Sequence, residues 1–181
     1  MTRYAGDEVV EKVLFDEETI AGRVAELGRA ISADHAEHDL RLVTVLRGSV
    51  FFLADLCRAI DVPLTLDFMA VSSYAGGSGG SARITKDLDD PIEGASVVLV
   101  EDIIDTGLTL NYVLSALRAR KPASLSVCTL LDKDVRRIVD LPIEYRGFAV
   151  PDRFLVGYGL DLNGRFRNLP YVATVRDEEV L

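Results

Sequence analysis

Hydrophobic and polar residues alternate along this chain in two rhythms, one typical of amphipathic helices and one typical of buried strands. From Asp16 to about residue 36, apolar residues recur every three or four positions, and Asp16 with the two glutamates that follow predicts a capped helix start. Residues 96–100 are apolar after the first, the pattern of a strand buried on both faces of a parallel sheet. Residues 110–120 return to the helical spacing, so the chain is predicted to alternate between strands and helices.

The remaining segments continue this alternation. Strands are predicted over residues 42–46, 63–72, 83–88 and 124–132, and a helix over residues 50–60. Such an order predicts an α/β fold with a parallel central sheet flanked by helices on both faces. The chain has 181 residues, 49% of them hydrophobic, and neither a repeat nor a linker interrupts the pattern. We therefore expect a single domain over residues 1–181.

Charge and composition narrow the possible partners. The formal net charge is −9, which argues against broad nucleic-acid binding because phosphate backbones are held chiefly by clustered Lys and Arg. No apolar run approaches the ~18 residues of a membrane span, and the first residues lack the apolar core of a signal peptide. We therefore expect a cytoplasmic protein with neither a nucleic-acid nor a membrane partner.

The cysteines and histidines are expected to be structural. Cys57 falls in a helical pattern and Cys128 in a strand pattern, so both are expected to be reduced, packed thiols. His35 and His38 are the only histidines, and no third metal ligand lies near them in the sequence. Their spacing near the end of the first helix therefore favours a solvated helix end over a metal site.

Candidate chemistry is concentrated directly after the buried strand of residues 96–100. Glu101 and Asp102 stand at its carboxyl end, where open α/β sheets bind their ligands. Carboxylates do not bind phosphate, but they suit ribose hydroxyls or Mg²⁺, a hard cation that prefers oxygen ligands and usually accompanies substrate phosphates. The strand end is therefore predicted to bind a sugar, a metal ion or both.

A turn rich in hydroxyl groups follows and leads into the next helix, formed by Asp105, Thr106, Gly107 and Thr109. Backbone N–H groups at a helix start carry partial positive charge and have no intrahelical partners, so they can bind a phosphate, and the glycine allows close approach. The simpler alternative is that Asp105 or Thr106 only caps the helix. The order of strand, acidic pair, third acid and hydroxyl turn favours a phosphosugar site.

The segment of residues 98–109 resembles the phosphoribosyl diphosphate motif of type I phosphoribosyltransferases, in the form Glu-Asp-Ile-Ile-Asp-Thr-Gly of the hypoxanthine-guanine group. The resemblance extends from about residue 14 to residue 175. It implies purine salvage, in which the 5-phosphoribosyl group of phosphoribosyl diphosphate is transferred to N9 of hypoxanthine or guanine with one or two Mg²⁺ ions. It also implies a hood subdomain from about residues 1–15 and 133–181, and a lid loop at about residues 73–84.

Within the motif, the resemblance implies a role for each residue. Asp105 is the expected catalytic base, which takes the proton at purine N7. Glu101 and Asp102 are expected to hold the ribose hydroxyls and Mg²⁺. Some relatives carry Lys at the position of Leu108, whose absence here leaves the backbone of the loop to bind the phosphate. The expected 5′-phosphate loop comprises Thr106, Gly107, Leu108 and Thr109.

Further residues are expected, by the same resemblance, to bind pyrophosphate. The turn at Arg47 and Gly48 again joins a strand end to a helix, and family members commonly carry Lys in place of Arg47, after a peptide bond that is often cis. From the residues alone, an ordinary capped helix with a solvated Arg47 fits this turn equally well. Ser73 and Tyr74 of the Gly- and Ser-rich lid loop, and Arg167 near the chain end, are also expected to reach the diphosphate.

The purine base is expected to bind near the end of the chain. By resemblance, Lys133 donates to the purine O6, so adenine, whose amino group would face that donor, should be a poor substrate. Phe154 is expected to stack on the purine, and the backbone of Leu155 to meet the base edge. Asp161 is expected to serve a second Mg²⁺ through water and the diphosphate.

Two alternatives are kept beside this interpretation. One is an RNA-binding regulator of pyrimidine operons with uracil phosphoribosyltransferase activity, which would favour a basic face and a different acidic motif. The charge of −9 and the Ile-Ile-Asp-Thr match count against it. The other is a nucleotide sensor without catalysis, which would need neither Asp105 nor a lid. A homodimer or homotetramer is expected by analogy with the family.

Overall fold

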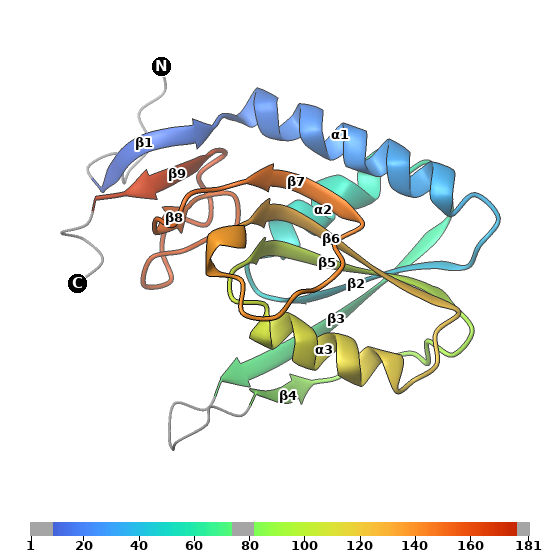
Figure 1. The fold of residues 1–181 in the computed structure, drawn as a ribbon. Helices are drawn as coiled ribbons and strands as arrows, with labels where there is room; N and C mark the ends of the chain where they lie inside the picture. The colour runs from blue at the N-terminus through green and yellow to red at the C-terminus, as the bar shows by residue number, and fades with distance from the viewer. Residues whose placement is uncertain (1–8, 74–81, 177–181) are drawn as a thin grey trace.

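The chain forms two β-sheets in the computed structural model, which describes residues 9–73 and 82–176 (Figure 1). The larger sheet has six strands in the order β4-β3-β2-β5-β6-β7, and the smaller has three in the order β1-β9-β8. The strands are β1 (Val10–Phe15), β2 (Leu40–Leu46), β3 (Leu64–Ser73), β4 (Ala82–Lys86), β5 (Ser96–Ile104), β6 (Ser124–Asp132), β7 (Tyr145–Ala149), β8 (Leu155–Val156) and β9 (Val172–Val175). The helices are α1 (Glu17–Asp34), α2 (Val50–Ala59), α3 (Leu108–Arg118) and the short 3₁₀ helix η1 (Asp134–Arg136).

Strand β5 lies inside the larger sheet, and its side chains alternate between two hydrophobic cores. Val98 and Val100 pack with residues of α1 and α2 on one face of the sheet. Val97 and Leu99 pack with residues of α3 on the other face (Figure 1). All four side chains are fully buried, which explains why the sequence shows a continuous apolar run here rather than an alternating one.

The predicted α/β fold with helices on both faces is confirmed, with two differences in detail. Strands β2, β3, β5, β6 and β7 are parallel, but β4 runs antiparallel to β3. The connection over residues 74–81 is shorter than the dozen or more residues that a parallel crossover requires. Strand β5 also continues to Ile104, so Glu101 and Asp102 belong to the last residues of the strand.

The smaller sheet brings the two ends of the described chain together. Strand β1 pairs antiparallel with β9, which also pairs antiparallel with β8. Figure 1 shows this sheet beyond the carboxyl ends of β5, β6 and β7. The late segments of the chain therefore stand close to the strand ends that carry the predicted acids.

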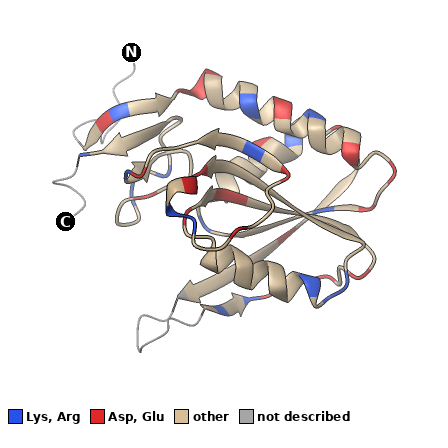
Figure 2. Ribbon diagram, viewed as in Figure 1, with Lys and Arg blue, Asp and Glu red and all other residues tan. Residues whose placement is uncertain are grey.

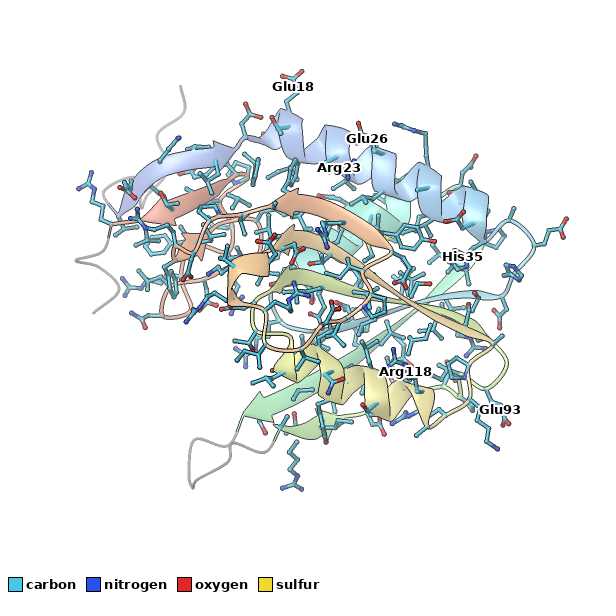
Figure 3. All side chains as sticks on the ribbon, in the orientation of Figure 1. Glu18, Arg23, Glu26, His35, Glu93 and Arg118 are labelled. Atoms are coloured by element: carbon cyan, nitrogen blue, oxygen red, sulfur yellow. The ribbon has the colours of Figure 1, made fainter. Side chains whose placement is uncertain are left out.

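Helix α1 begins as predicted but ends differently. At its start, Asp16 caps the helix by accepting a hydrogen bond from Thr19 N at 2.9 Å. His35, however, is not solvated: it is buried, with Nδ1 3.0 Å from Ser96 Oγ and Nε2 3.3 Å from the Tyr145 hydroxyl. Figure 3 places it at the end of α1 on the side of the sheet. The expectation of a solvated helix end is therefore wrong for His35 and right for His38, which is exposed.

Both cysteines are free thiols, as expected. Cys57 is half-buried in α2 and Cys128 is buried in β6. Across residues 9–73 and 82–176, none of the helices combines the length and the apolar character that crossing a bilayer would require.

Candidate active site

Two cavities meet at the carboxyl end of β5. The larger, of about 570 Å³, is lined by Asp102, Ile103, Asp105, Lys133, Arg136, Asp152, Arg153, Phe154, Leu155, Leu160, Asp161 and Arg167. The smaller, of about 180 Å³, is lined by Val45, Glu101, Ile103, Ile104, Asp105, Thr106, Gly107, Thr109 and Leu110. We call them the large cavity and the small cavity. Ile103 and Asp105 line both, so Asp105 is the ionisable residue that stands where they adjoin.

The acidic pair at the end of β5 is divided between the cavities. Successive side chains of a strand point to opposite faces, so Glu101 lines the small cavity and Asp102 the large one. Burial raises the pKa of Glu101 well above its usual value, and the neighbouring Asp102 raises it further. Burial also raises the pKa of Asp102, partly offset by the hydrogen bond from Ile103 N and by Arg167. Both carboxylates would thus be stabilised by a cation or by hydroxyl donors.

The small cavity is formed by the turn that joins β5 to α3. Gly107 is the residue before α3 and has φ 82°, in the left-handed region that favours glycine. Thr106, Gly107 and Thr109, the residues of the predicted 5′-phosphate loop, line the cavity together. The Leu108 side chain is 52% exposed and is not among the lining residues, so only its backbone is available to the loop.

The segment after β6 holds the turn of residues 105–109 in place. Ile138 N donates to Thr106 O at 2.9 Å, and Arg137 Nε donates to Asp105 O at 3.3 Å. The same guanidinium forms an ion pair with Asp132, whose carboxylate is buried at the end of β6. Arg137 and Asp132 were not predicted from the sequence. The only signal in the sequence is an Arg that follows an acidic strand end by five residues, and it does not identify the backbone that the Arg contacts.

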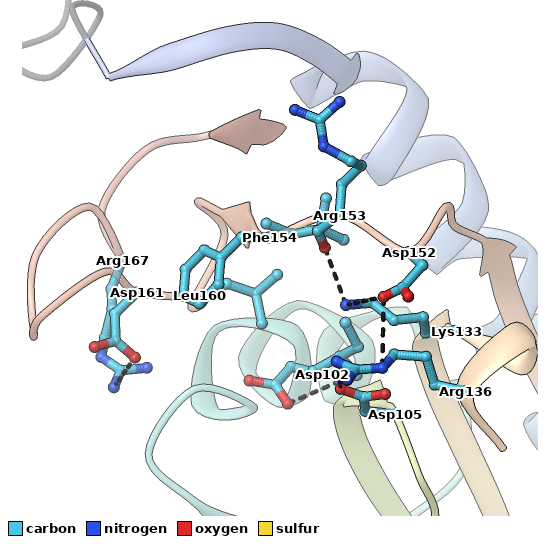
Figure 4. Close-up of a pocket in the computed structure, with 12 residues that line it drawn as sticks. Asp102, Asp105, Lys133, Arg136, Asp152, Arg153, Phe154, Leu160, Asp161 and Arg167 are labelled. Atoms are coloured by element: carbon cyan, nitrogen blue, oxygen red, sulfur yellow. Dashed lines mark hydrogen bonds and ion pairs between the residues drawn. The ribbon is translucent and has the colours of Figure 1, made fainter. Parts of the chain in front are cut away.

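The large cavity is lined by both an ammonium group and an aromatic ring (Figure 4). Lys133 is buried, and its Nζ donates to Arg153 O at 2.9 Å and lies 3.9 Å from Asp152 Oδ1. Phe154 remains 39% exposed although it is aromatic, so part of this side chain is accessible to a ligand. The structure thus brings the predicted residues Lys133, Phe154 and Leu155 to one cavity.

Asp161 and Arg167 form the opposite side of the large cavity. Their side chains make an ion pair at 2.6 Å, and Arg167 Nη1 also donates to Gly159 O at 2.5 Å. Arg167 lowers the pKa of Asp102 and Asp161 raises it, so these three charges interact across the cavity. In the described residues, no three His, Cys, Asp or Glu side chains converge closely enough to enclose a metal ion.

The second predicted anion-binding turn lies against Asp102. The Leu46–Arg47 peptide bond is cis, the form that the family resemblance implied. Gly48 is buried, and a Cβ at this position would collide with Asp102 Oδ2. Arg47 itself is exposed. Ser73 ends β3, whereas Tyr74 and most of the expected lid loop lie outside the described residues.

Fold and site together define an α/β protein with a glycine- and threonine-containing turn beside an acidic strand end, next to a cavity lined by an aromatic ring and an ammonium group. The chain belongs to the phosphoribosyltransferase family: the family model described as phosphoribosyl transferase domain matches residues 12–163. Hypoxanthine phosphoribosyltransferase of Salmonella typhimurium is 49% identical over 168 residues, covering 91% of this chain and 94% of that protein.

Solved structures give the same result. The crystal structure of a hypoxanthine phosphoribosyltransferase from Staphylococcus aureus matches with a TM-score of 0.94 and 41% identity, covering 98% of both chains. The enzyme from Trypanosoma cruzi, in complex with the product IMP, matches with a TM-score of 0.91 and 40% identity over 98% of this chain and 99% of that one. Both matches extend over nearly the whole fold, including the smaller sheet.

Proposed function

We propose that this chain is a Mg²⁺-dependent hypoxanthine phosphoribosyltransferase that also accepts guanine. As a pentosyl-transferring enzyme of purine salvage, it converts phosphoribosyl diphosphate and the base into IMP or GMP and pyrophosphate. The observation that carries the proposal is the position of Asp105, which lines both cavities. An acid at this junction stands between an anion-binding loop and a cavity with an aromatic ring and an ammonium group.

The chemistry follows from which ligand occupies which cavity. The 5′-phosphate binds the small cavity through Thr106, Gly107 and Thr109, and the base binds the large cavity. The bond from base N9 to ribose C1′ forms as the bond from C1′ to the diphosphate oxygen breaks. The base must lose a proton in this step, and the Asp105 carboxylate accepts it at N7. The diphosphate leaves with the electron pair of the broken bond.

Selection of a 6-oxopurine depends on three residues of the large cavity. The Lys133 ammonium group donates to the purine O6, and Phe154 stacks on the ring with an offset geometry. The backbone of Leu155 meets the edge of the base. An adenine amino group facing Lys133 would leave two donors without acceptors, which disfavours that base.

The donor set at the strand end fits Mg²⁺ when substrate supplies the remaining ligands. Magnesium usually binds through one or two carboxylates and substrate phosphates rather than in a closed protein cage. Asp102 and Asp161 share the large cavity, and Glu101 faces the sugar side. When bound, the ion neutralises charge on the leaving diphosphate. We expect phosphoribosyl diphosphate to raise the melting temperature of the protein more with MgCl₂ than with EDTA, a test that requires no turnover.

The diphosphate is assigned to the residues around Asp102. Arg167 supplies a guanidinium group inside the large cavity, and the turn at Arg47 and Gly48 supplies backbone N–H groups. Ser73 and Tyr74 reach the diphosphate from the lid loop at about residues 73–84, which closes over the site and excludes water.

Three broader features complete the proposal. The chain acts as one phosphoribosyltransferase domain over residues 1–181, with a hood from about residues 1–15 and 133–181 that includes the smaller sheet. It assembles as a homodimer or homotetramer, which light scattering during size-exclusion chromatography would distinguish. It works in the cytoplasm, where the free thiols Cys57 and Cys128 would stay reduced.

The deciding experiment is a spectrophotometric assay with Mg²⁺, phosphoribosyl diphosphate and hypoxanthine, guanine, xanthine, adenine or uracil. Hypoxanthine and guanine should be turned over and adenine should react poorly. Turnover of uracil with no turnover of hypoxanthine would support the pyrimidine-operon alternative and overturn the proposal. That alternative is not favoured: the relatives above are purine enzymes, and Figure 2 shows basic residues interspersed with acidic ones rather than gathered on one element.

A further inference from the structure

One cation that the resemblance does not assign contacts the carboxylate of Asp105. Arg136 is the last residue of η1, and its Nη1 lies 3.4 Å from Asp105 Oδ2 (Figure 4). Its Nε lies 3.5 Å from Asp152 Oδ1, which in turn lies 3.9 Å from Lys133 Nζ. The wall of the large cavity therefore carries charges of alternating sign, in the order Lys133, Asp152, Arg136 and Asp105.

The two oxygens of the Asp105 carboxylate have different surroundings. Oδ2 faces Arg136. Oδ1 is buried and has no hydrogen-bond partner among the described residues. Buried polar atoms are nearly always hydrogen-bonded in native proteins, so an orphaned acceptor on a residue that lines both cavities indicates that the carboxylate finds a further donor when a ligand binds. The ion pair with Arg136 thus fixes the orientation of the carboxylate through Oδ2.

The shape of the guanidinium group explains how the Arg136 side chain contacts two carboxylates at once. Its planar, forked N–H donors can face two carboxylates at once, and here Nε faces Asp152 while Nη1 faces Asp105. The side chain is anchored on the Asp152 side, and Asp152 itself lies near the buried Lys133. A lysine would keep the charge but offers a single ammonium group, which cannot reproduce both contacts.

We propose that Arg136 is a positioning residue for the transfer step: it holds the Asp105 carboxylate in the orientation from which it accepts the proton of the bound base. This inference rests on the proposed function, in which Asp105 accepts the proton of the base. Arg136 is not a catalytic residue, because it acts through Asp105 rather than on a reacting atom. Its loss should therefore reduce the rate of the chemical step and leave the binding of phosphoribosyl diphosphate largely unchanged.

A double-mutant cycle tests this directly. Single-turnover rates with hypoxanthine, and KM values for phosphoribosyl diphosphate, are measured for the wild type, Arg136→Gln, Asp105→Asn and the double variant. Arg136→Gln should lower the rate about 10- to 100-fold, the scale of a misplaced catalytic group, with KM for phosphoribosyl diphosphate within about twofold. In the Asp105→Asn background, the same change should alter the rate less than about twofold, because the group it positions is absent.

Two further variants separate positioning from charge and from folding. Arg136→Lys should recover part of the rate. Arg118→Gln, an exposed arginine at the far end of α3 (Figure 3), should match the wild type in rate and melting temperature. The Arg136 side chain is 50% exposed, so its variants are expected to fold, which the melting temperature checks.

Each outcome bears on one claim. An unchanged rate in Arg136→Gln, or a loss that multiplies fully with the loss in Asp105→Asn, overturns the role of Arg136. An unchanged rate in Asp105→Asn instead overturns the assignment of Asp105 in the proposed function.

Discussion

The two ends of β5 both carry buried polar groups, but the protein treats them differently. At the amino end, His35 lies between Ser96 and Tyr145, and the Tyr145 hydroxyl donates to Asp34 Oδ2 at 2.9 Å. Ser96 also contacts Ser124 across the strands. The hydrogen-bonding groups at this end are thus satisfied within the chain, which is typical of a network that stabilises the fold.

At the carboxyl end of β5, the buried carboxylates have few hydrogen-bond partners within the described residues. Burial raises the pKa of Glu101 and Asp102, and Asp105 Oδ1 is an orphaned acceptor among the described residues. Perturbed carboxylates gathered in a cavity are typical of functional sites. The comparison indicates that one end of the strand is built for stability and the other for ligand binding, so changes at the two ends should affect different measurements.

The largest effect is expected for Asp105→Asn. The amide cannot accept the proton of the base, so kcat should fall by about 10² or more while the Kd for phosphoribosyl diphosphate stays nearly the same. Steady-state kinetics and calorimetry measure the two quantities. Asp134→Asn, an exposed acid in η1, is the matched control. Unchanged turnover in Asp105→Asn would remove this residue from its assigned role.

Gly48→Ala should disturb binding rather than proton transfer. The added Cβ collides with Asp102 Oδ2, so the carboxylate must move and the affinity for Mg²⁺ with phosphoribosyl diphosphate should fall about tenfold or more. Titration calorimetry checks this. Gly22→Ala is the control, because nothing lies within 4 Å of its Cβ position on α1. Equal affinities in the two variants would mean that the turn at Gly48 does not support the acidic site.

Lys133→Met should reduce the discrimination between hypoxanthine and adenine. Without the ammonium donor, kcat/KM for hypoxanthine should fall about tenfold, whereas the value for adenine should change little. The two values are compared in the assay with separate bases, and Lys12→Met, an exposed lysine on β1, serves as control. A parallel loss for both bases would contradict the proposed contact with O6.

The smallest effect concerns stability at the amino end. Burial lowers the pKa of His35 below its usual value, partly offset by Asp34, so the unfolded chain takes up a proton at higher pH than the folded protein does. The free energy of unfolding should therefore be highest above about pH 6.5 and fall as the pH drops below that value.

Urea denaturation across this pH range measures the effect. His35→Gln should remove this component of the pH dependence, and His38→Gln, at an exposed position, should retain it. Neither variant should change kcat at pH 8. A loss of kcat in His35→Gln without a loss of stability would show that the two ends of β5 are not separate in function.

Much of the fold could be predicted from the sequence because burial leaves a periodic pattern. Residues 97–100 form a continuous apolar run because a hydrophobic core packs against each face of this strand. The apolar stripe of α1 faces only one of these cores. The orientation of β4 and the burial of His35 leave no such pattern. His35 is buried by Ser96 and Tyr145, which lie 61 and 110 positions away, so only the folded chain brings them together.

The candidate site likewise has a part that could be predicted from the sequence and a part that could not. Glu101, Asp102 and the loop after them are adjacent in the sequence, so their order alone predicts a site. The residues that hold this loop come from the segment after β6: Arg136 contacts Asp105 across 31 positions, and Arg137 contacts the backbone of Asp105 across 32. Pairs of this kind depend on the register of β5 and β6, which the continuous apolar run of β5, unlike an alternating pattern, does not specify.

The most direct test of the account is a crystal structure of the protein with Mg²⁺, phosphoribosyl diphosphate and a hypoxanthine analogue that cannot react. The account predicts the 5′-phosphate in the small cavity, the purine between Phe154 and the Lys133 ammonium group, and a carboxylate oxygen of Asp105 within hydrogen-bond distance of the base. A sugar phosphate bound elsewhere, with the three acids pointing away from it, would contradict the account.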